Sequence, residues 1–522
     1  MKPISRWYLA LAVFTGGMTT LAVELAASRL LGNVFGTSNL VWANIIGLIL
    51  LYLTAGYFIG GRWADRSPNP ITFFSLLAWA AFASGLAPLV ARPVLQFAAQ
   101  AMEAFNAPVI GGSFLSVLVL FSAPITLLGC VSPFAIRLAL TDSRHAGQVS
   151  GRMYAISTIG SIVGTFAPTL WLIPTIGTLR TFMLFSGLLM LVALGGLWQV
   201  DRRRALLSLW MPLAVAALAF FTISGSLKPT AGLLEERESA YNFIQVVERG
   251  GTRYLLLNEG QGIHSVYNPN DPETFGTWDF FLVAPFFNAP PHLPSQVRSL
   301  ALVGLAAGTI AKQYTQVYGP VPIDGIEIDP AIVEVGRRYF DMNEPNLNVI
   351  IEDGRWALTN SKNTYSVIGV DAYRLPYIPW HLTTREFFTE ARDHLTADGA
   401  LVINVGRTFT DRRLIEAMVG TLQSVFASVY VVDVPDTFNS IVYATVQPTE
   451  AANLSANLAL LPEATPALLR DAVARAIANL QPTPISDIVF TDDWAPVESL
   501  TNSIVVRFIL SGSIYLSGSK TS

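Results

Sequence analysis

Glycine and acidic residues end four apolar segments between residues 300 and 371, and their types and spacing could do chemistry. The segments are LALVG, IDGIE, NVIIEDG and YSVIGVD, with polar ends that include Gly304, Glu327, Asp353 and Asp371. Short apolar runs that alternate with helical stretches are typical of a parallel sheet, so we expect these ends at one edge. Open α/β sheets bind their ligands at that edge.

The spacing of these residues predicts a nucleoside-type ligand. Gly304 and Gly308 border a tight strand-to-helix turn, and Glu327 follows 19 residues after Gly308. A carboxylate in that place can accept hydrogen bonds from both ribose hydroxyls. The turn lacks the lysine of a phosphate-binding loop, which argues against a nucleoside triphosphate. Asp353 is expected near the base, although a carboxylate there can also cap the next helix.

Asp371 is the candidate general base, with Tyr373 beside it. An amine that attacks a carbon must lose a proton, and a carboxylate with a phenol partner can accept it. The alternative is that Asp371 only caps or anchors a loop. The aromatic segment 373–388 can fold over the site as a lid, with His381 lining the pocket, or form an ordinary β–α connection.

Further candidate substrate contacts each have a structural alternative. His264 lies in a β-rich stretch, where a lone histidine is more often a structural residue. Trp278 and Asp279 can bind a cation through the indole face and the carboxylate, or form a surface turn with a buried tryptophan. Asp492 and Asp493 either start a helix or belong to a lid over the site.

The composition predicts a membrane protein. Of 522 residues, 52% are hydrophobic and only 13% are charged, which is about half the usual charged share. The net charge of −4 gives no indication of nucleic acid as a partner. The single cysteine, Cys130, excludes an internal disulfide framework and a cysteine metal cluster, and we expect no metal.

Residues 1–228 predict a polytopic α-helical membrane domain of about seven or eight helices. Each candidate span is near or above the roughly 20 residues that cross a bilayer. The spans are 7–32, 39–61, 71–91, 110–140, 153–175, 180–200 and 205–225. Glu24 and Arg29 in the first span are costly at membrane depth, and they indicate transport, helix pairing or a place near the interface.

Lysine and arginine occur in alternate loops, which should therefore be cytoplasmic in a multi-pass protein of the inner membrane. Seven spans that start inside leave the C-terminal domain outside, whereas an eighth span within 92–140 would place it in the cytoplasm. We expect the cytoplasmic arrangement. The remaining chain divides into a small antiparallel β domain (235–295), a Rossmann-like domain (296–450), and a C-terminal helix with TDDWAPVE (451–522).

From residue 235 onward, the order of motifs resembles the spermidine synthase (polyamine aminopropyltransferase) family, and most closely its membrane-fused bacterial members. The resemblance implies a small N-terminal β domain and a class I methyltransferase-type Rossmann domain. It also implies decarboxylated S-adenosylmethionine as the donor and a polyamine as the acceptor. The matching segments are SAYNFIQVVE with Tyr241, LNEGQGIHS with His264, WDFF with Trp278 and Asp279, VGLAAGTIA, IEIDP, EDG and VDAYRLP.

Two positions depart from the family pattern. Ala307 replaces the aspartate of the glycine loop, and Arg374 replaces the second aspartate of Asp-x-x-Asp. The resemblance implies that these carboxylates hold amino groups of the donor and acceptor. Arg374 can instead grip a carboxylate, which intact S-adenosylmethionine carries.

Three functions are therefore open. The first is a membrane aminopropyltransferase that acts on a small-molecule amine, and the second is an S-adenosylmethionine-dependent methyl- or aminocarboxypropyltransferase. The third is a non-catalytic nucleoside-binding transporter or sensor. The expected partners are the amine and the lipid bilayer, and a homodimer is one option for the assembly.

Overall fold

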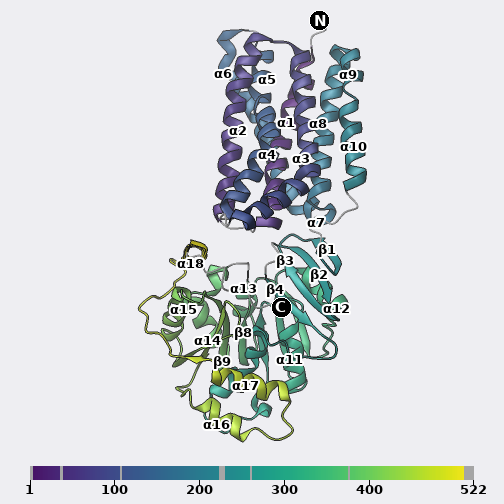
Figure 1. Ribbon diagram of the computed structural model, residues 1–522. Coiled ribbons are helices and arrows are strands. Elements are labelled where there is room, and N and C mark those ends of the chain that lie inside the picture. Colours follow the sequence, from purple (N-terminus) through teal and green to yellow (C-terminus); the bar gives the residue numbers. More distant parts are fainter. Residues whose placement is uncertain are drawn as a thin grey trace. The chain divides into compact units, whose positions relative to one another are not determined.

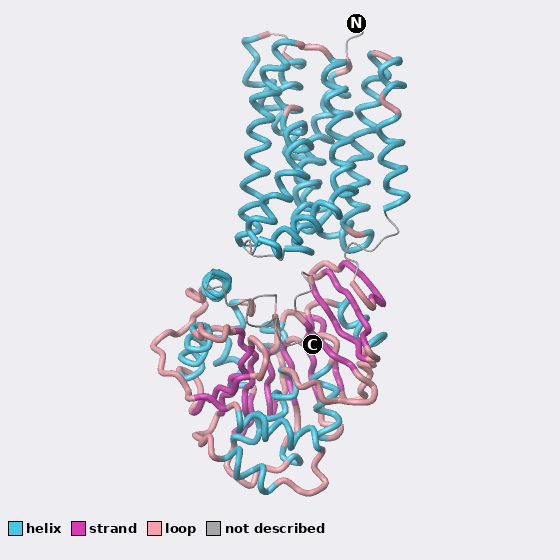
Figure 2. Tube along the Cα trace, in the orientation of Figure 1, coloured by secondary structure: helices cyan, strands magenta, loops and turns pink. Residues whose placement is uncertain are grey.

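A computed structural model describes residues 4–35, 39–105, 109–140, 142–222, 230–258, 262–373 and 377–510. By their internal contacts these residues form two compact units (Figures 1 and 2). The first is helical and contains most residues up to Ala231, together with Glu236–Phe243. The second contains most of the chain from Ile244 onward.

The helical unit has seven helices that are long and apolar enough to cross a membrane, counted over the described residues. Among the described residues of 92–140, one such helix is found, Gly112–Ala139. The unit as a whole contains more helical segments than candidate spans, because some spans combine consecutive segments. These segments are α1 (Arg6–Phe35), α2 (Asn39–Arg66), α3 (Pro70–Phe105), α4 (Val109–Gly129), α5 (Val131–Ala139), η1 (Ser143–His145), α6 (Ala146–Ala167), η2 (Pro168–Leu172), α7 (Ile173–Ile176), α8 (Thr178–Val200), α9 (Arg202–Leu207) and α10 (Trp210–Thr222).

Small residues allow α1 and α6 to pack closely. A Cβ atom at Gly160 would lie 2.1 Å from the carbonyl oxygen of Phe14, and one at Gly164 would lie 2.0 Å from that of Met18. Both distances are below van der Waals contact, so only glycine fits. This is the small-residue packing that membrane helices use.

A four-stranded sheet contains β1 (Leu233–Glu238), β2 (Phe243–Arg249), β3 (Thr252–Leu257) and β4 (Ile263–Tyr267), in that order. The pairs β2/β3 and β3/β4 are antiparallel. In β4 the register shifts, because Leu255 pairs with Ser265 whereas Leu256 pairs with Ile263. His264 is therefore an extra, bulged residue, and bulges commonly re-aim side chains next to sites.

The α/β core is an eight-stranded sheet with the order β12-β10-β11-β9-β8-β5-β6-β7. Strands β9, β8, β5, β6 and β7 are parallel neighbours, whereas β10, β11 and β12 pair antiparallel. This mixed sheet confirms the Rossmann-like fold predicted from the sequence. The strands are β5 (Leu300–Val303), β6 (Ile323–Glu327), β7 (Leu347–Ile351), β8 (Tyr365–Val370), β9 (Leu395–Gly406), β10 (Ser428–Asp433), β11 (Asn439–Thr445) and β12 (Leu480–Gln481).

Helices cover both faces of this sheet. One apolar cluster joins the sheet to α11, η3, α16 and α17, and another joins it to α13, α14 and α15. Their bounds are η3 (Thr277–Phe287), η4 (Pro294–Gln296), α11 (Thr309–Tyr318), α12 (Pro330–Tyr339), α13 (Gly354–Thr359), η5 (Trp380–Leu382), α14 (Arg385–Asp393), α15 (Arg413–Gln423), α16 (Asn453–Leu460), α17 (Ala467–Ala478) and α18 (Val497–Leu510).

Two segments lie outside the domains in which the sequence placed them. Thr277–Phe287, predicted within the β domain, is a 3₁₀ helix buried in the α/β core. β12 at Leu480–Gln481 pairs with β10, so the eight-stranded sheet includes residues beyond 450. Burial of apolar surface places Thr277–Phe287, whereas backbone pairing with β10 places β12.

Candidate functional site

The glycine turn after β5 lies against the end of β8. Gly304 has φ +94°, and a Cβ atom there would lie 2.6 Å from the carbonyl oxygen of Asp371. Strands on one side of β5 continue to β6 and β7, and those on the other to β8 and β9. Gly304 and Asp371 therefore meet where the strand order reverses, which is the usual place of ligand binding in open α/β sheets.

Gly308 closes the turn and begins α11. It has φ +87°, and an added Cβ would lie 2.6 Å from Cγ of Met342. Ala306 also has a positive φ, of 48°, and its backbone N–H donates a hydrogen bond of 2.9 Å to Glu327. The turn is thus held by the carboxylate that the sequence assigned to the ribose.

Glu327 is buried at the end of β6, with 8% of its surface exposed. Its Oε2 accepts a hydrogen bond from Ala306 N, and its Oε1 accepts one of 3.0 Å from Asp329 N. Burial raises the pKa of Glu327 to about 7, although these backbone hydrogen bonds lower it in part. Each oxygen keeps a second lone pair, so a fixed carboxylate can still accept a hydroxyl.

Asp371, Tyr373 and Asn404 form a hydrogen-bonded group. Nδ2 of Asn404 donates to Oδ1 of Asp371 at 3.0 Å, and the Tyr373 hydroxyl donates to the Asn404 carbonyl at 3.1 Å. Burial raises the pKa of Asp371 to about 7, against the lowering effect of the Asn404 hydrogen bond. Burial and the nearby Asp371 also raise the pKa of Tyr373. The carboxyl is thus suited to exchange a proton near neutral pH.

Asn404 is a site residue that the sequence interpretation missed. It is buried near the end of β9, and its Oδ1 accepts a hydrogen bond of 2.8 Å from Asn439 on β11. An asparagine within the apolar run LVINVG was the available signal, because a buried amide requires hydrogen-bond partners.

Asp353 follows β7 and caps α13. Its Oδ1 accepts hydrogen bonds of 3.1 Å from the backbone of Arg355 and Trp356, and its Oδ2 lies 3.1 Å from Nε2 of His381. The capping alternative is therefore present in the structure. A base contact stays a prediction, which the remaining lone pair of Oδ2 would permit.

Ala307 and His264 occupy positions that the resemblance to the spermidine synthase family assigns to polar side chains. Ala307 is 2% exposed within an apolar cluster with α12, β2 and β3, and its N–H donates to Ser265 at 2.9 Å. Nε2 of His264 is buried without a hydrogen-bond partner among the described residues. Burial lowers the pKa of His264 to about 4, so the ring is neutral at pH 7.

Trp278 and Asp279 conflict with their predicted role in substrate binding. Asp279 has no exposed surface, and it forms an ion pair of 2.7 Å with Arg475 of α17. It also accepts hydrogen bonds from Thr274 and Gln313. Trp278 is 9% exposed and belongs to the α/β core. The pair is a core element, because a buried carboxylate requires such partners.

The other predicted contacts lie in different surroundings. Asp492 and Asp493 are both exposed, and Asp492 pairs with Arg355 at 2.7 Å. Tyr241 is half exposed and belongs to the helical unit, where its carbonyl accepts a hydrogen bond from Arg29. Arg374 lies outside the described residues. The substrate contacts of these residues stay predictions.

A pocket of about 130 Å³ lies between α11 and the segment after β4. Its lining includes Gly308, Lys312, Gln313 and Asp341, and none of the strand-end carboxylates. Lys312 is already paired with Asp341 and Glu344. We therefore place the candidate site at the strand ends and not in this pocket.

Comparison with known proteins finds relatives of the C-terminal part of the chain. Residues 302–456 match the family model of the spermine/spermidine synthase domain. A probable polyamine aminopropyl transferase of Bifidobacterium longum is 33% identical over 241 residues, which cover 44% of this chain and 52% of that protein. The match thus spans about half the length of this relative.

Two further proteins differ in how much of the chain they cover. A polyamine aminopropyltransferase of Corynebacterium efficiens is 24% identical over 449 residues, with 78% of this chain and 79% of that protein covered. This share exceeds what residues 232–522 can supply, so the similarity extends into the helical unit. The crystal structure of a probable spermidine synthase from Corynebacterium glutamicum has a TM-score of 0.38 and 21% identity, and covers 48% of this chain and 95% of that chain.

The family match lies on the strands and turns that hold Glu327, Asp353 and Asp371. It confirms the resemblance that the motifs indicate. The C-terminal part of this chain is thus similar to the spermine/spermidine synthase domain over residues 302–456.

Proposed function

We propose that this protein is an integral-membrane aminopropyltransferase, which moves an aminopropyl group from decarboxylated S-adenosylmethionine to a small amine. The observation that carries the proposal is the contact between the glycine turn and Asp371 at the reversal of strand order. This contact brings the glycine turn, which would bind the donor, next to the candidate base Asp371. The names of the relatives support the reaction class.

The proposed reaction is a direct displacement. The amine nitrogen bonds to the aminopropyl carbon next to sulfur, and the carbon–sulfur bond breaks with its electron pair left on sulfur. The products are the extended amine and methylthioadenosine. Before the attack, Asp371 takes a proton from the acceptor ammonium and thereby frees the lone pair of its nitrogen. Asn404 Nδ2 holds this carboxylate in place, and the Tyr373 hydroxyl donates to the backbone carbonyl of Asn404.

Glu327 and Asp353 would hold the adenosine part of the donor. Their carboxylates follow adjacent parallel strands, β6 and β7, as the ribose and base contacts require. Backbone hydrogen bonds from Ala306 and Asp329 fix the Glu327 carboxylate before the donor arrives. Such preorganisation reduces the ordering cost of binding.

Ala307 favours a second candidate function, the transfer of a methyl or aminocarboxypropyl group from intact S-adenosylmethionine. Its side chain packs in an apolar cluster, so this position offers no carboxylate to the ammonium of a decarboxylated donor. A donor with its own carboxylate would find a partner in a residue such as Arg374. The two candidates therefore differ in the donor and share Asp371 as the base.

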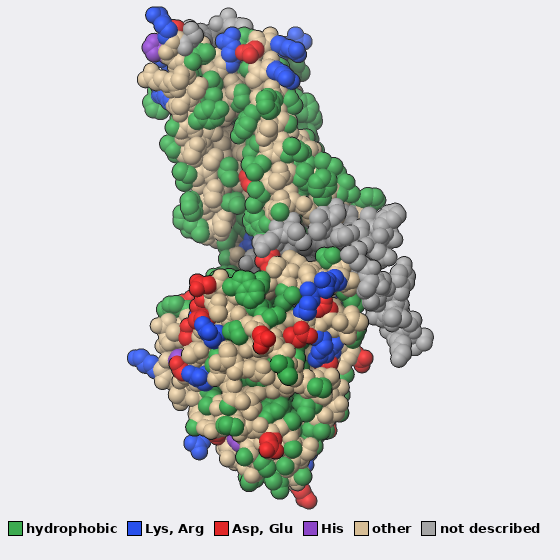
Figure 3. Space-filling model, turned by 90° about the vertical axis from the view of Figure 1, so that its left-hand side faces the viewer, with side chains coloured by type: hydrophobic (Ala, Val, Ile, Leu, Met, Phe, Trp, Pro, Cys, Tyr) green, Lys and Arg blue, Asp and Glu red, His purple; other side chains and the backbone are tan. Residues whose placement is uncertain are grey.

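We also propose that the helical unit lies in the inner membrane as a multi-pass domain. Large apolar side chains are exposed along its helices, and Lys and Arg gather at one end of the unit (Figure 3). That end should be cytoplasmic. With seven spans, the chain leaves α10 at the opposite end, which argues against the expected cytoplasmic position of the synthase domain.

A reporter fused after residue 522 tests this orientation. Alkaline phosphatase is active only outside the cytoplasm, whereas a green fluorescent protein folds to its fluorescent form inside it. Phosphatase activity without fluorescence would support an external domain. The reverse result would require an even number of spans and restore the cytoplasmic arrangement.

Donor binding is the experiment that tests the proposed function. Calorimetry on the full-length protein in detergent compares decarboxylated S-adenosylmethionine, S-adenosylmethionine and methylthioadenosine, and mass spectrometry identifies the modified amine. Preference for the decarboxylated donor, with an acceptor gaining an aminopropyl group, is the expected result. Preference for the intact donor that Arg374→Ala removes would favour the second candidate. Binding of none of the three would refute both and leave a transporter or sensor.

A further inference from the structure

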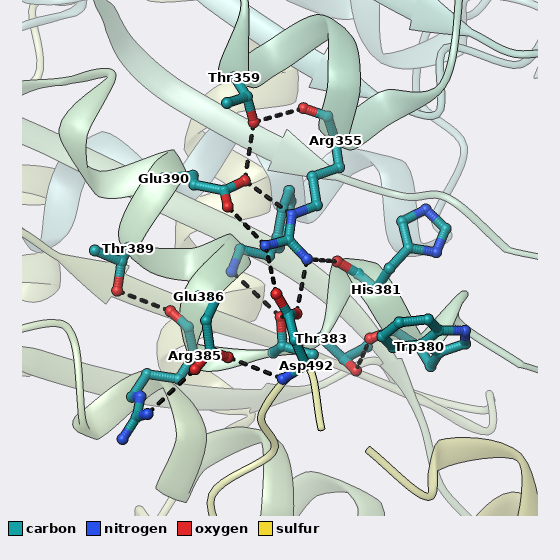
Figure 4. Close-up of polar contacts among 12 residues, drawn as sticks. Arg355, Thr359, Trp380, His381, Thr383, Arg385, Glu386, Thr389, Glu390 and Asp492 are labelled. Carbon is teal, nitrogen blue, oxygen red and sulfur yellow. Dashed lines mark hydrogen bonds and ion pairs between the residues drawn. The ribbon is translucent and has the colours of Figure 1, made fainter. Parts of the chain in front are cut away.

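The side chain of Arg355 is saturated with hydrogen bonds (Figure 4). Nε and Nη2 donate to the two carboxylate oxygens of Glu390, at 2.8 and 2.6 Å. Nη1 and Nη2 donate to those of Asp492, at 2.7 and 2.9 Å. The second N–H of Nη1 points to the carbonyl of His381, at 3.3 Å. Arginine has five N–H donors in a planar fork, and all five have an acceptor here.

These contacts join chain segments that are far apart in sequence. Asp492 is 137 residues from Arg355, and its Oδ1 also accepts a hydrogen bond of 2.7 Å from the Thr384 hydroxyl. Its backbone N–H donates to Glu386 at 3.0 Å. The backbone N–H of Arg385 donates to the carbonyl of Phe490 at 2.8 Å. The segment around Asp492 is therefore fixed to the start of α14 by side chains and by backbone.

The same guanidinium reaches the candidate donor site. Arg355 lies two residues after Asp353, whose carboxylate caps α13 and contacts the His381 ring at 3.1 Å. Arg355 holds the backbone of His381 while Asp353 holds its ring. The contacts of the His381 backbone with Arg355 and of the His381 ring with Asp353 therefore both depend on how α13 and the segment 380–384 lie relative to each other.

Asp492 and Glu390 are held in their charged forms, which favours a stable ion pair of each with Arg355. Hydrogen bonds from Arg355 lower the pKa values of Asp492 and Glu390. Bidentate pairs between arginine and carboxylates are charge-assisted and geometrically specific. Two such pairs on one guanidinium constrain it more than a single surface ion pair does.

We infer that Arg355 and Asp492 are positioning residues, which clamp the segment from Trp380 to Thr384 beside Asp353 and thereby shape the donor site. Asp492 then acts through Arg355 and Thr384, and not by the substrate contact that the sequence suggested. The role of the clamp in donor binding rests on the proposed function. The existence of the clamp is testable without any ligand.

The test compares Asp492→Asn with Asp493→Asn in the full-length protein. The two residues are adjacent, of the same type and both exposed, but none of the contacts above involves Asp493. Hydrogen exchange without ligand should be faster over residues 380–384 in Asp492→Asn, by at least tenfold, and unchanged in Asp493→Asn. Thr384→Val removes a different hydrogen bond to the same carboxylate and also the N-cap of α14, so its increase should extend into the first turn of α14.

Donor affinity then separates positioning from general stability. In Asp492→Asn, the Kd for the donor should rise by about tenfold while the melting temperature stays within 2 °C of wild type. Equal exchange in the two asparagine variants would refute the clamp. Faster exchange with unchanged donor affinity would refute its role in the site. If the wild-type protein binds no donor, the proposed function and the purpose of the clamp both fail, whereas the exchange result still decides whether the clamp exists.

Discussion

Replacement of Asp371 by asparagine should stabilise the protein at neutral pH while it abolishes turnover. Burial raises the pKa of this carboxyl from 3.8 to about 7. The folded state therefore keeps a proton that the unfolded state releases between about pH 4 and 7. In this window the stability of the wild type falls as the pH rises, and above pH 7 the loss is complete.

The magnitude follows from the pKa difference of about 3. Each pKa unit corresponds to about 1.4 kcal/mol, so ionised Asp371 destabilises the fold by up to about 4 kcal/mol at pH 8 and about 2 kcal/mol at pH 5. Asparagine removes this cost and can still accept the hydrogen bond from Asn404. With about 2 °C per kcal/mol for a domain of this size, melting should rise by about 8 °C at pH 8 and about half of that at pH 5.

The assay is thermal unfolding of the full-length protein in detergent, followed by intrinsic fluorescence at pH 5 and pH 8. Asp487→Asn is the matched control, because Asp487 is exposed. Turnover should fall by about 10²- to 10⁴-fold in Asp371→Asn, as for loss of a general base. A melting temperature that stays the same or falls, or that rises equally at both pH values, would refute the argument from burial.

Three other substitutions test the remaining parts of the site. Glu327→Gln should weaken donor binding by about tenfold or more in calorimetry, because hydrogen bonds to a charged acceptor are worth about 1.5–3 kcal/mol; an unchanged Kd would contradict the ribose contact. Gly304→Ala should reduce turnover at least about 100-fold, since its Cβ would lie 2.6 Å from the Asp371 carbonyl oxygen. Gly319→Ala, also at positive φ but in open space, should lower the stability of the fold by about 1–3 kcal/mol and leave turnover unchanged. Equal losses in the two alanine variants would show that strain and not contact matters. Asn404→Ala removes a hydrogen bond that lowers the pKa of the base, so the acid limb of the pH profile of kcat/KM should move to higher pH, and an unmoved limb would exclude this role.

The sheet and its carboxyl edge could be predicted because each relevant strand carries its own local signal. Apolar runs of four to six residues end at Gly304, Glu327, Asp353 and Asp371, and parallel pairing brings these ends to one edge. The long apolar helices were equally visible, since a span requires only length and hydropathy. The local sequence pattern is sufficient to predict a helix or strand whose structure depends mainly on its own residues.

The errors arise where distant residues decide. WDFFLVAPFF was assigned to the β domain, but its aromatic side chains fill the α/β core as a 3₁₀ helix. Asp279 was assigned to substrate binding because its true partner, Arg475, lies 196 residues away in the sequence and could not be recognised from it. The pairing of Asp492 with Arg355 could not be predicted for the same reason, and the substrate contact of Asp492 stays a prediction. No local pattern reports such pairs.

The two carboxyls with raised pKa values have a joint consequence for binding. Glu327 and Asp371 are each about half protonated near pH 7, so this edge of the sheet carries less negative charge than its composition suggests. A sulfonium donor and an ammonium acceptor are both cations, and a nearby cation favours the ionised carboxylates. Entry of these substrates would therefore release protons from both carboxyls and strengthen as the pH rises through 7. An uncharged nucleoside, whose ribose hydroxyls would meet Glu327, would release protons from that carboxyl alone. The number of protons released on binding would thus separate a sulfonium-dependent transferase from a nucleoside sensor.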